Sequence, residues 1–207
     1  MKSDMSELVE RLIKIGVLKT SGLIEAFLKN DRQNFVPGIY SWRAYENSPI
    51  SIGYSQTISQ PSTVAFMMEL LQPKSGDKVL DIGFGSGWTS GILSVSVGKN
   101  GTVLSVEIVP EVYKFGKGNL SKYHYSNIEF FEGSWTDLAP DNFDCILVSA
   151  GADSTVPQKL ALLLKLGGRL VIPVNNFSGQ SIRLIKKISE NEFDEYNYPG
   201  YIFVPLV

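Results

Sequence analysis

The sequence predicts an α/β fold in which helices cover both faces of a mostly parallel, doubly wound sheet. From residue 78 onward, short apolar segments rich in β-branched residues alternate with segments of helical periodicity. An acid and three glycines follow the first apolar segment, within residues 81–87, which is typical of a tight turn from a strand into a helix. Two later apolar segments, 181–188 and 200–206, have no helical segment between them. They predict antiparallel strands at the sheet edge.

Residues 1–60 are expected to form an N-terminal helical cap followed by a substrate-side loop. Apolar residues recur at helical spacing in residues 6–18 and again in residues 21–32. The stretch from 39 to 60 is aromatic and rich in turn-forming residues, and it has no clear period. We therefore predict an irregular loop there, which is a candidate lid over a binding site.

Residues 61–207 are expected to form the core, so that the chain is a single structural unit. Pro61 suits the first turn of a helix, and Pro73 marks where that helix must have ended. The strands predicted for the parallel part of the sheet are 78–82, 102–107, 127–132, 143–149 and 168–174.

The composition argues against several kinds of partner. With 19 basic and 21 acidic residues the net charge is −2, so no global positive field attracts nucleic acid or an anionic membrane. No apolar run is long enough to span a membrane and no signal segment is recognised, so a cytoplasmic protein is expected. The single cysteine, Cys145, lies in an apolar run and is interpreted as a core residue rather than a nucleophile. No metal site is expected.

The glycine turn in residues 79–88 indicates the kind of ligand. A dinucleotide-binding fingerprint would place a glycine at position 88, where this chain has Trp88. Asp81 comes before the first glycine, and a carboxylate there would repel a phosphate but attract a cation. S-adenosylmethionine carries a cationic amino-acid end and no phosphate, so we infer that it is the cofactor.

A second acid, Glu107, supports this cofactor. It ends the predicted strand 102–107, which follows the glycine turn. In doubly wound sheets an acid at the end of the second strand accepts hydrogen bonds from ribose hydroxyls. We therefore expect Glu107 to bind the ribose of S-adenosylmethionine.

Several segments together resemble one family, the protein L-isoaspartate (D-aspartate) O-methyltransferases, over nearly the whole chain. The most specific are the segment 57–61 ahead of the glycine turn and the tail 203–206. The resemblance implies a Rossmann-like, S-adenosylmethionine-dependent methyltransferase fold. The segments that carry it are 31–32, 35–37, 52–61, 79–88, 142–152, 156–160, 166–174 and 203–206.

The resemblance also implies an activity: methyl transfer from S-adenosylmethionine to the α-carboxylate of L-isoaspartyl residues in damaged proteins or peptides, which initiates repair. It assigns Ser59 as the active-site residue. Ser59 could equally cap the helix that begins near Pro61, and the two roles can coexist. The implied cofactor contacts are Thr57, Ile58, Ser59, Asp81, Gly83, Gly85, Gly87, Glu107, Ile108, Gly133 and Ser134.

The proposed chemistry requires no catalytic base, because a substrate carboxylate with an ordinary pKa is already ionised at neutral pH. This suits a chain whose only histidine, His124, lies outside the matching segments and is interpreted as a surface or packing residue. Many members of the family have histidine where this chain has Ser62, and Gly-Asp-Gly where it has Gly133, Ser134 and Trp135. These departures concern substrate placement and the contact to the adenine amino group.

Other functions are compatible with parts of the pattern. A related methyltransferase could act on another carboxylate, another peptide or a different nucleophile. A nucleic-acid N-methyltransferase would usually carry an Asn-Pro-Pro-Tyr-like motif after the fourth strand, where residues 149–152 have only small side chains. A binding protein without turnover is disfavoured by the presence of Ser59, Asp81 and Glu107.

Overall fold

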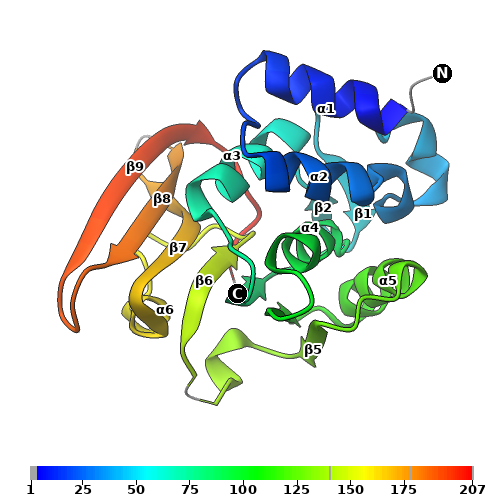
Figure 1. Ribbon diagram of the computed structural model, residues 1–207. Coiled ribbons are helices and arrows are strands. Elements are labelled where there is room, and N and C mark those ends of the chain that lie inside the picture. The colour runs from blue at the N-terminus through cyan, green and yellow to red at the C-terminus, as the bar shows by residue number, and fades with distance from the viewer. Residues whose placement is uncertain (1–3, 140, 178, 207) are drawn as a thin grey trace.

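A central sheet with helices packed against it organises the molecule (Figure 1). The computed structural model describes residues 4–139, 141–177 and 179–206. The strand order is β5-β4-β3-β6-β7-β8-β9; strands from β5 to β7 are parallel, whereas β8 and β9 pair antiparallel. The predicted sheet with antiparallel C-terminal strands is therefore confirmed. The strands are β3 Lys78–Ile82, β4 Thr102–Glu107, β5 Ile128–Glu132, β6 Phe143–Val148, β7 Leu164–Asn176, β8 Gly179–Lys187 and β9 Phe193–Tyr201.

Helices precede and connect the parallel strands. Two of them, α1 and α2, form the predicted N-terminal helical region, shown in blue in Figure 1, and α3 begins at Pro61 as predicted. The α-helices are α1 Asp4–Lys14, α2 Ser21–Lys29, α3 Pro61–Leu71, α4 Trp88–Val97, α5 Pro110–Leu120 and α6 Gln158–Leu162. The 3₁₀ helices are η1 Arg32–Phe35, η2 Gly38–Arg43, η3 Ser121–Tyr123 and η4 Trp135–Asp137.

The central strands β3 and β6 are buried on both faces of the sheet. Successive side chains of a strand point to opposite faces, so each strand contributes to two cores. On one face, Val79 and Cys145 belong to a core shared with residues of α1 to α5. On the other face, Leu80 and Ile146 belong to a second core that includes Leu160 of α6. Burial on both faces explains why these strands are continuous apolar runs in the sequence.

The strand predicted at residues 200–206 is wrong. The edge strand is β9, and it pairs with β8 partly through an ion pair between Arg183 and Glu195 and a contact of Lys186 Nζ with the Tyr196 ring, 4.9 Å from its centroid. Most β9 residues are exposed or only half buried. The strand consequently has no buried apolar alternation by which the sequence could reveal it.

The prediction of an irregular loop over 39–60 is also wrong in part. The segment contains most of η2 and a hairpin formed by β1 Ile50–Gly53 and β2 Gln56–Ile58. The turn residues Tyr54 and Ser55 both have positive φ values, 54° and 59°. Hairpin turns of this kind usually carry Asn or Gly at both central positions, so Tyr54 and Ser55 do not indicate a hairpin turn. A lid function for the segment stays a prediction.

The N-terminal helices pack directly onto the helices that cover the sheet. The indole nitrogen of Trp88 at the start of α4 donates a hydrogen bond to the carbonyl of Asn30, at 2.9 Å. The ring of Phe27 in α2 meets the Trp88 ring edge-on, with centroids 5.4 Å apart. Residues on both sides of position 60 thus share one hydrophobic core. The division into a cap and loop over 1–60 and a methyltransferase core over 61–207 stays a prediction.

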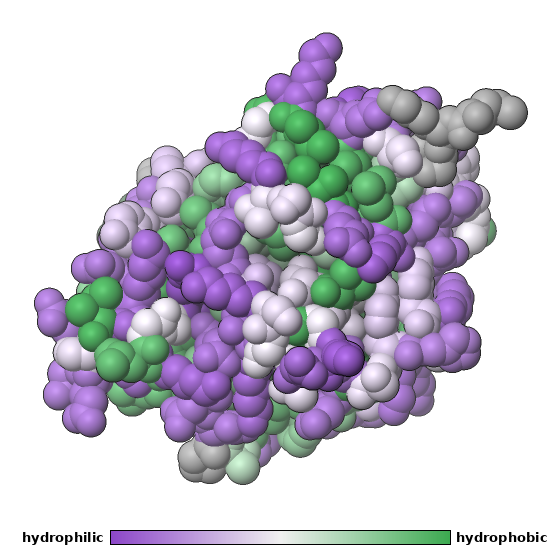
Figure 2. All heavy atoms as spheres, in the orientation of Figure 1, coloured by the Kyte–Doolittle hydropathy of each residue, from purple (hydrophilic) through white to green (hydrophobic). Residues whose placement is uncertain are grey.

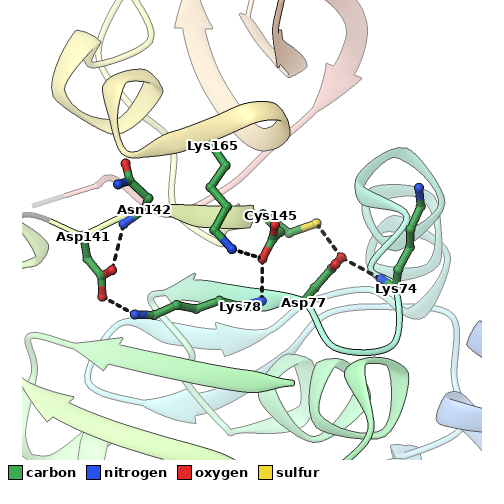
Figure 3. A network of polar contacts seen from close by, with 8 residues as sticks. Lys74, Asp77, Lys78, Asp141, Asn142, Cys145 and Lys165 are labelled. Atoms are coloured by element: carbon green, nitrogen blue, oxygen red, sulfur yellow. Dashed lines mark hydrogen bonds and ion pairs between the residues drawn. The ribbon is translucent and has the colours of Figure 1, made fainter. Parts of the chain in front are cut away.

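A polar network joins the amino-terminal ends of β3, β6 and β7, at the end of the sheet opposite the carboxyl ends of the parallel strands (Figure 3). One Asp144 carboxylate oxygen accepts from the backbone N–H of Lys78 at 2.8 Å and from Lys165 Nζ at 2.7 Å, while Lys78 Nζ pairs with Asp141. Cys145 is buried next to this network, and burial raises the pKa of its thiol well above the usual range. This environment fits the interpretation of Cys145 as a core residue.

The surface is mainly hydrophilic on the face drawn in Figure 2, with apolar patches over α1 and α2. Exposed apolar side chains of this part of the chain include Ile13, Ile15 and Leu28. Within the described residues, none of the helices has the length and apolar character needed to cross a membrane.

Candidate active site

A cavity of about 790 Å³, counted with the space open to solvent, lies at the carboxyl ends of β3, β4 and β6. Here the strand order changes direction, because β4 lies on one side of β3 and β6 on the other. Ligands of open α/β sheets bind at this position. The predicted site residues that line the cavity are Thr57, Ile58, Ser59, Gly83, Gly85, Glu107, Ile108 and Gly133; Asp81, Gly87 and Ser134 do not line it.

The glycine turn forms one wall of the cavity. Gly83 and Gly85 both have positive φ, 72° and 55°, a conformation that residues with a side chain rarely adopt. The backbone N–H of Gly83 donates to the carbonyl of Val106 at 2.8 Å, which joins the turn to β4. The N–H of Gly85 donates to a carboxylate oxygen of Glu107 at 3.2 Å. The two predicted binding elements are therefore in direct contact.

Gly87 serves helix packing instead of lining the cavity. It precedes α4 with φ 89°, and a Cβ atom there would lie 2.9 Å from the carbonyl oxygen of Gly116 and from side-chain atoms of Leu120. Both of these residues belong to α5. The glycine thus allows α4 and α5 to approach closely.

Glu107 is held in place by backbone donors. One of its oxygens accepts from Gly85 as described, and the other accepts from the N–H of Val109 at 3.1 Å. Its side chain is almost fully buried, and burial raises the pKa of the carboxyl, an effect that the backbone hydrogen bonds partly oppose. A carboxylate has about four lone-pair positions, so both oxygens can still accept from ribose hydroxyls.

Asp81 lies just behind the cavity wall and is fully buried. Its Oδ2 atom accepts hydrogen bonds from the hydroxyls of Thr89 and Ser90, at 2.8 and 2.7 Å. Its Oδ1 atom is buried and has no hydrogen-bond partner within the described ranges. Burial is the main cause that raises the pKa of Asp81 to about 6; the hydrogen bonds from Ser90 and Thr89 oppose this rise, and the charge of the neighbouring Glu107 adds to it. A cation bound in the cavity, which Thr89 lines, would stabilise the ionised form.

Ser59 follows β2 and lines the cavity with Thr57 and Ile58. The N-cap position of α3 is occupied by Gln60, not by Ser59, and no side chain caps the helix. The alternative that Ser59 is the helix cap is therefore wrong. Its carbonyl accepts a hydrogen bond from Arg32 at 3.0 Å, whereas its hydroxyl has no protein partner in residues 4–139, 141–177 and 179–206.

A second hollow adjoins the first at Ser59. Thr57, Ser59, Ser149 and Val204 line both, so the two spaces meet there. The second hollow is also lined by Phe66 and by residues 200–203, and none of the described residues that line it carries a charge. The arrangement can hold a cofactor on one side of Ser59 and a peptide segment on the other.

The C-terminal tail reaches the cavity by leaving the sheet edge after β9. The N–H of Gly151, in the loop after β6, donates to the carbonyl of Val204 at 2.7 Å, and the N–H of Leu206 donates to the carbonyl of Gly151 at 2.8 Å. In Figure 1 the red chain after β9 returns to the middle of the molecule. The cavity residues not individually predicted as contacts include Phe84, Ser86, Trp88, Thr89, Trp135, Ser149, Ala150, Val204, Pro205 and Leu206.

Most of these additional residues had a signal in the sequence, because residues 84–88, 149–150 and 204–206 belong to the segments that carry the family resemblance. Thr89 and Trp135 lie outside those segments. No cluster of at least three His, Cys, Asp or Glu side chains able to hold a metal ion occurs in the part of the chain that the structure describes.

The site suits S-adenosylmethionine. A carboxylate oxygen of Asp81 lacks a partner next to the cavity, as expected for a group that a cationic ligand would compensate, and Glu107 lies where a ribose acceptor belongs. Together, the sheet topology, the glycine turn and the two acids define an S-adenosylmethionine-dependent methyltransferase. A family model, "Protein-L-isoaspartate(D-aspartate) O-methyltransferase (PCMT)", matches residues 3–207. The chain belongs to this family.

Individual relatives agree with this assignment. A Methanopyrus kandleri protein named protein-L-isoaspartate O-methyltransferase is 41% identical over 203 residues, which are 97% of this chain and 89% of the relative. One of the same name from Pyrococcus abyssi is 37% identical, over 96% of this chain and 92% of the relative. A crystal structure from Plasmodium falciparum, assigned to the same enzyme and in complex with S-adenosyl-L-homocysteine, is 24% identical, covers 100% of this chain and 99% of that chain, and has a TM-score of 0.88. This last likeness shows the fold.

Proposed function

We propose that the protein transfers a methyl group from S-adenosylmethionine to the α-carboxylate of L-isoaspartyl residues in damaged proteins and peptides, and so initiates their repair. The observation that carries this proposal is the meeting of the two cavities at Ser59. The names of the relatives at 37 to 41% identity support it.

The reacting groups need alignment more than proton transfer. S-adenosylmethionine supplies a methyl group on a positively charged sulfur. The substrate carboxylate is ionised at neutral pH, so its oxygen can attack the methyl carbon while the carbon–sulfur bond breaks and its electron pair stays on sulfur. Positioning of such reactants can supply about 7 to 11 kcal/mol. His124 lines neither cavity, in agreement with a reaction that needs no histidine base.

Ser59 is proposed to orient the carboxylate. Its hydroxyl has no partner within the described part of the chain, and so it is available to donate to a carboxylate oxygen. The neutral walls of the second hollow exclude competing charges and strengthen the attraction between carboxylate and sulfonium. The segment 39–60, which supplies Thr57 and Ser59, is proposed to exclude water as a cover.

The side chains that line the two cavities indicate the kind of partner. No lysine or arginine lines either cavity in the described residues, which supports a peptide partner over a nucleic acid. We propose the cytoplasm as the location, because the only cysteine is a buried thiol and the chain forms no internal disulfide.

A related activity on another carboxylate or peptide is the second candidate. It is favoured by the presence of a small residue, Ser62, in the wall of the second hollow. Ser62 lines the second hollow, and its hydroxyl accepts a hydrogen bond from Gln60 Nε2 at 2.6 Å. A small side chain there leaves more room for substrate than a histidine would.

A methyl-transfer assay distinguishes these candidates. Three peptides of one sequence are compared, with L-isoaspartate, aspartate or asparagine at a single position. The proposal expects methylation of the isoaspartyl peptide alone. Equal methylation of the aspartyl peptide supports the second candidate, and methylation of neither contradicts the proposed substrate.

A further inference from the structure

Trp135 separates two hollows of the molecule. It lines the cofactor cavity, and it also lines a neighbouring hollow with Lys159 and with Leu138 and Leu163, two leucines that pack against the second core. Lys159 does not line the cofactor cavity. A side chain between two hollows can be contacted by a ligand on one side and supported by the protein on the other.

The turn that carries Trp135 begins next to the acid assigned to the ribose. Glu107 and Glu132 are register partners in β4 and β5, and the N–H of Gly133 donates to the carbonyl of Glu107 at 3.0 Å. Ile108, which follows Glu107 and is 40% exposed, also lines the cavity. A base attached to a ribose at Glu107 therefore meets Ile108 and Trp135.

Ser134 is turned toward its own backbone. Its hydroxyl accepts from the N–H of Thr136 at 3.3 Å and lies 2.8 Å from the Thr136 hydroxyl, so that it caps η4. Since Ser134 does not line the cavity, the side chain that this turn offers to a base is the indole of Trp135.

Lys159 holds this turn from the opposite side. Its ammonium lies 5.7 Å from the centroid of the Trp135 ring and donates to the carbonyl of Thr136 at 2.5 Å. One cation thus contacts both the ring and the backbone that follows it. A cation over an indole face is attractive and restricts the orientation of the ring.

We propose that Trp135 is the residue that binds the adenine of the cofactor, by contact with the face of the base, and that Lys159 is a positioning residue that acts through Trp135. The proposal rests on the S-adenosylmethionine-dependent reaction proposed above. Recognition of a base by its face tolerates changes at its edge, because every base has a π face. The exocyclic amino group of adenine therefore contributes little to affinity in this protein.

Calorimetric titration of S-adenosylhomocysteine tests the proposal without turnover. Trp135→Leu is expected to weaken binding by roughly tenfold to a hundredfold, and Trp135→Phe by less, because stacking on an aromatic residue has about this effect per base. Lys159→Met is expected to weaken binding by about twofold to fivefold. Lys159→Arg is expected to keep the wild-type affinity, because arginine also carries a positive charge. Thermal unfolding confirms that each variant is folded.

Tryptophan fluorescence gives an independent measurement. In a Trp42→Phe background, which removes the indole that is 75% exposed, ligand binding is expected to change the emission. Most of that change should disappear when Trp135→Phe is added, while the contribution of Trp88 remains. The deaminated analogue, S-inosylhomocysteine, is expected to bind wild-type protein within about threefold of S-adenosylhomocysteine.

Several results would overturn the proposal. Wild-type affinity in a folded Trp135→Leu protein would show that the indole does not contact the base. A loss above tenfold for the deaminated analogue would show recognition by the base edge. Unchanged affinity in Lys159→Met would remove its positioning role. Failure of the wild-type protein to bind S-adenosylhomocysteine would contradict the proposed function itself. The variant titrations test only the roles of Trp135 and Lys159.

Discussion

The Nη2 atom of Arg32 donates a hydrogen bond to the carbonyl oxygen of Ser59 at 3.0 Å. The same guanidinium donates to the carbonyls of Ala44 at 2.8 Å and Ser48 at 3.0 Å. Arg32 is fully buried, 5.4 Å from the ring centroid of Trp88, and burial lowers the pKa of its guanidinium to about 9. One buried cation therefore connects η1, the 39–60 segment and the candidate active-site residue.

Arg32→Met is expected to lower the free energy of unfolding by about 3 to 5 kcal/mol, because it leaves several buried carbonyls without a donor. Arg43→Met is a matched control, since Arg43 pairs with Glu46 near the surface; it should cost less than about 1 kcal/mol. Urea unfolding measures both changes. A loss below about 1 kcal/mol in Arg32→Met would contradict the role assigned to this guanidinium.

Ser59→Ala is expected to lower kcat roughly tenfold to a hundredfold, the effect of losing a hydrogen bond to a charged group. Stability should hardly change, because Ser59 does not occupy the N-cap position of α3 and its hydroxyl has no partner within the described residues. Turnover and urea unfolding are measured on the same preparation. Wild-type turnover in the folded variant would exclude the proposed catalytic role.

Glu107→Ala is expected to weaken S-adenosylmethionine binding by roughly tenfold to a hundredfold, because the ribose loses a charged acceptor. The backbone N–H groups of Gly85 and Val109 also lose their partner, so the melting temperature should fall. Glu132→Ala is the control, since Glu132 is the exposed register partner of Glu107. If calorimetry gives the two variants equal affinities, Glu107 does not bind the cofactor.

The raised pKa of Asp81 leads us to expect that cofactor affinity depends on pH. Because burial raises its pKa to about 6, the folded protein binds this proton more tightly than the unfolded chain does. The stabilisation from Asp81 is therefore largest below the unfolded pKa of about 4 and is lost as the pH rises through about 6.

A cationic ligand favours the ionised form, so affinity for S-adenosylmethionine should rise by up to about tenfold per pH unit below pH 6 and level off above it. Asp81→Asn should bind more weakly and lose this slope. Titrations from pH 5 to 8 measure both proteins, and parallel profiles would show that Asp81 does not act on the ligand.

Gly87→Ala is expected to destabilise the protein by at least about 1 to 2 kcal/mol, because φ is positive and a Cβ atom would approach Gly116 and Leu120 at 2.9 Å. Gly118→Ala is the matched control within α5, where a Cβ atom has no neighbour within 4 Å. It should stabilise the protein by up to about 1 kcal/mol. Equal thermal stability of the two variants would contradict the packing role of Gly87.

The sequence by itself determined the parallel sheet and the glycine turn that forms a wall of the candidate cofactor cavity. Strands β3 and β4 have the predicted bounds, because their residues are buried on both faces and form uninterrupted apolar runs. The glycine turn and Glu107 were also predictable, since local backbone geometry and the end of one strand require these residue types at these places. Both properties depend on neighbours close in the chain or on simple burial.

Only the tertiary structure decided the rest. β9 is held by polar cross-strand pairs, and the tail around Val204 leaves the sheet to bind Gly151. Arg32 contacts carbonyls far along the chain, and Gly87 is required by α5. Each of these features depends on atoms distant in sequence and on packing distances of a few ångströms, which no local pattern of residue types encodes.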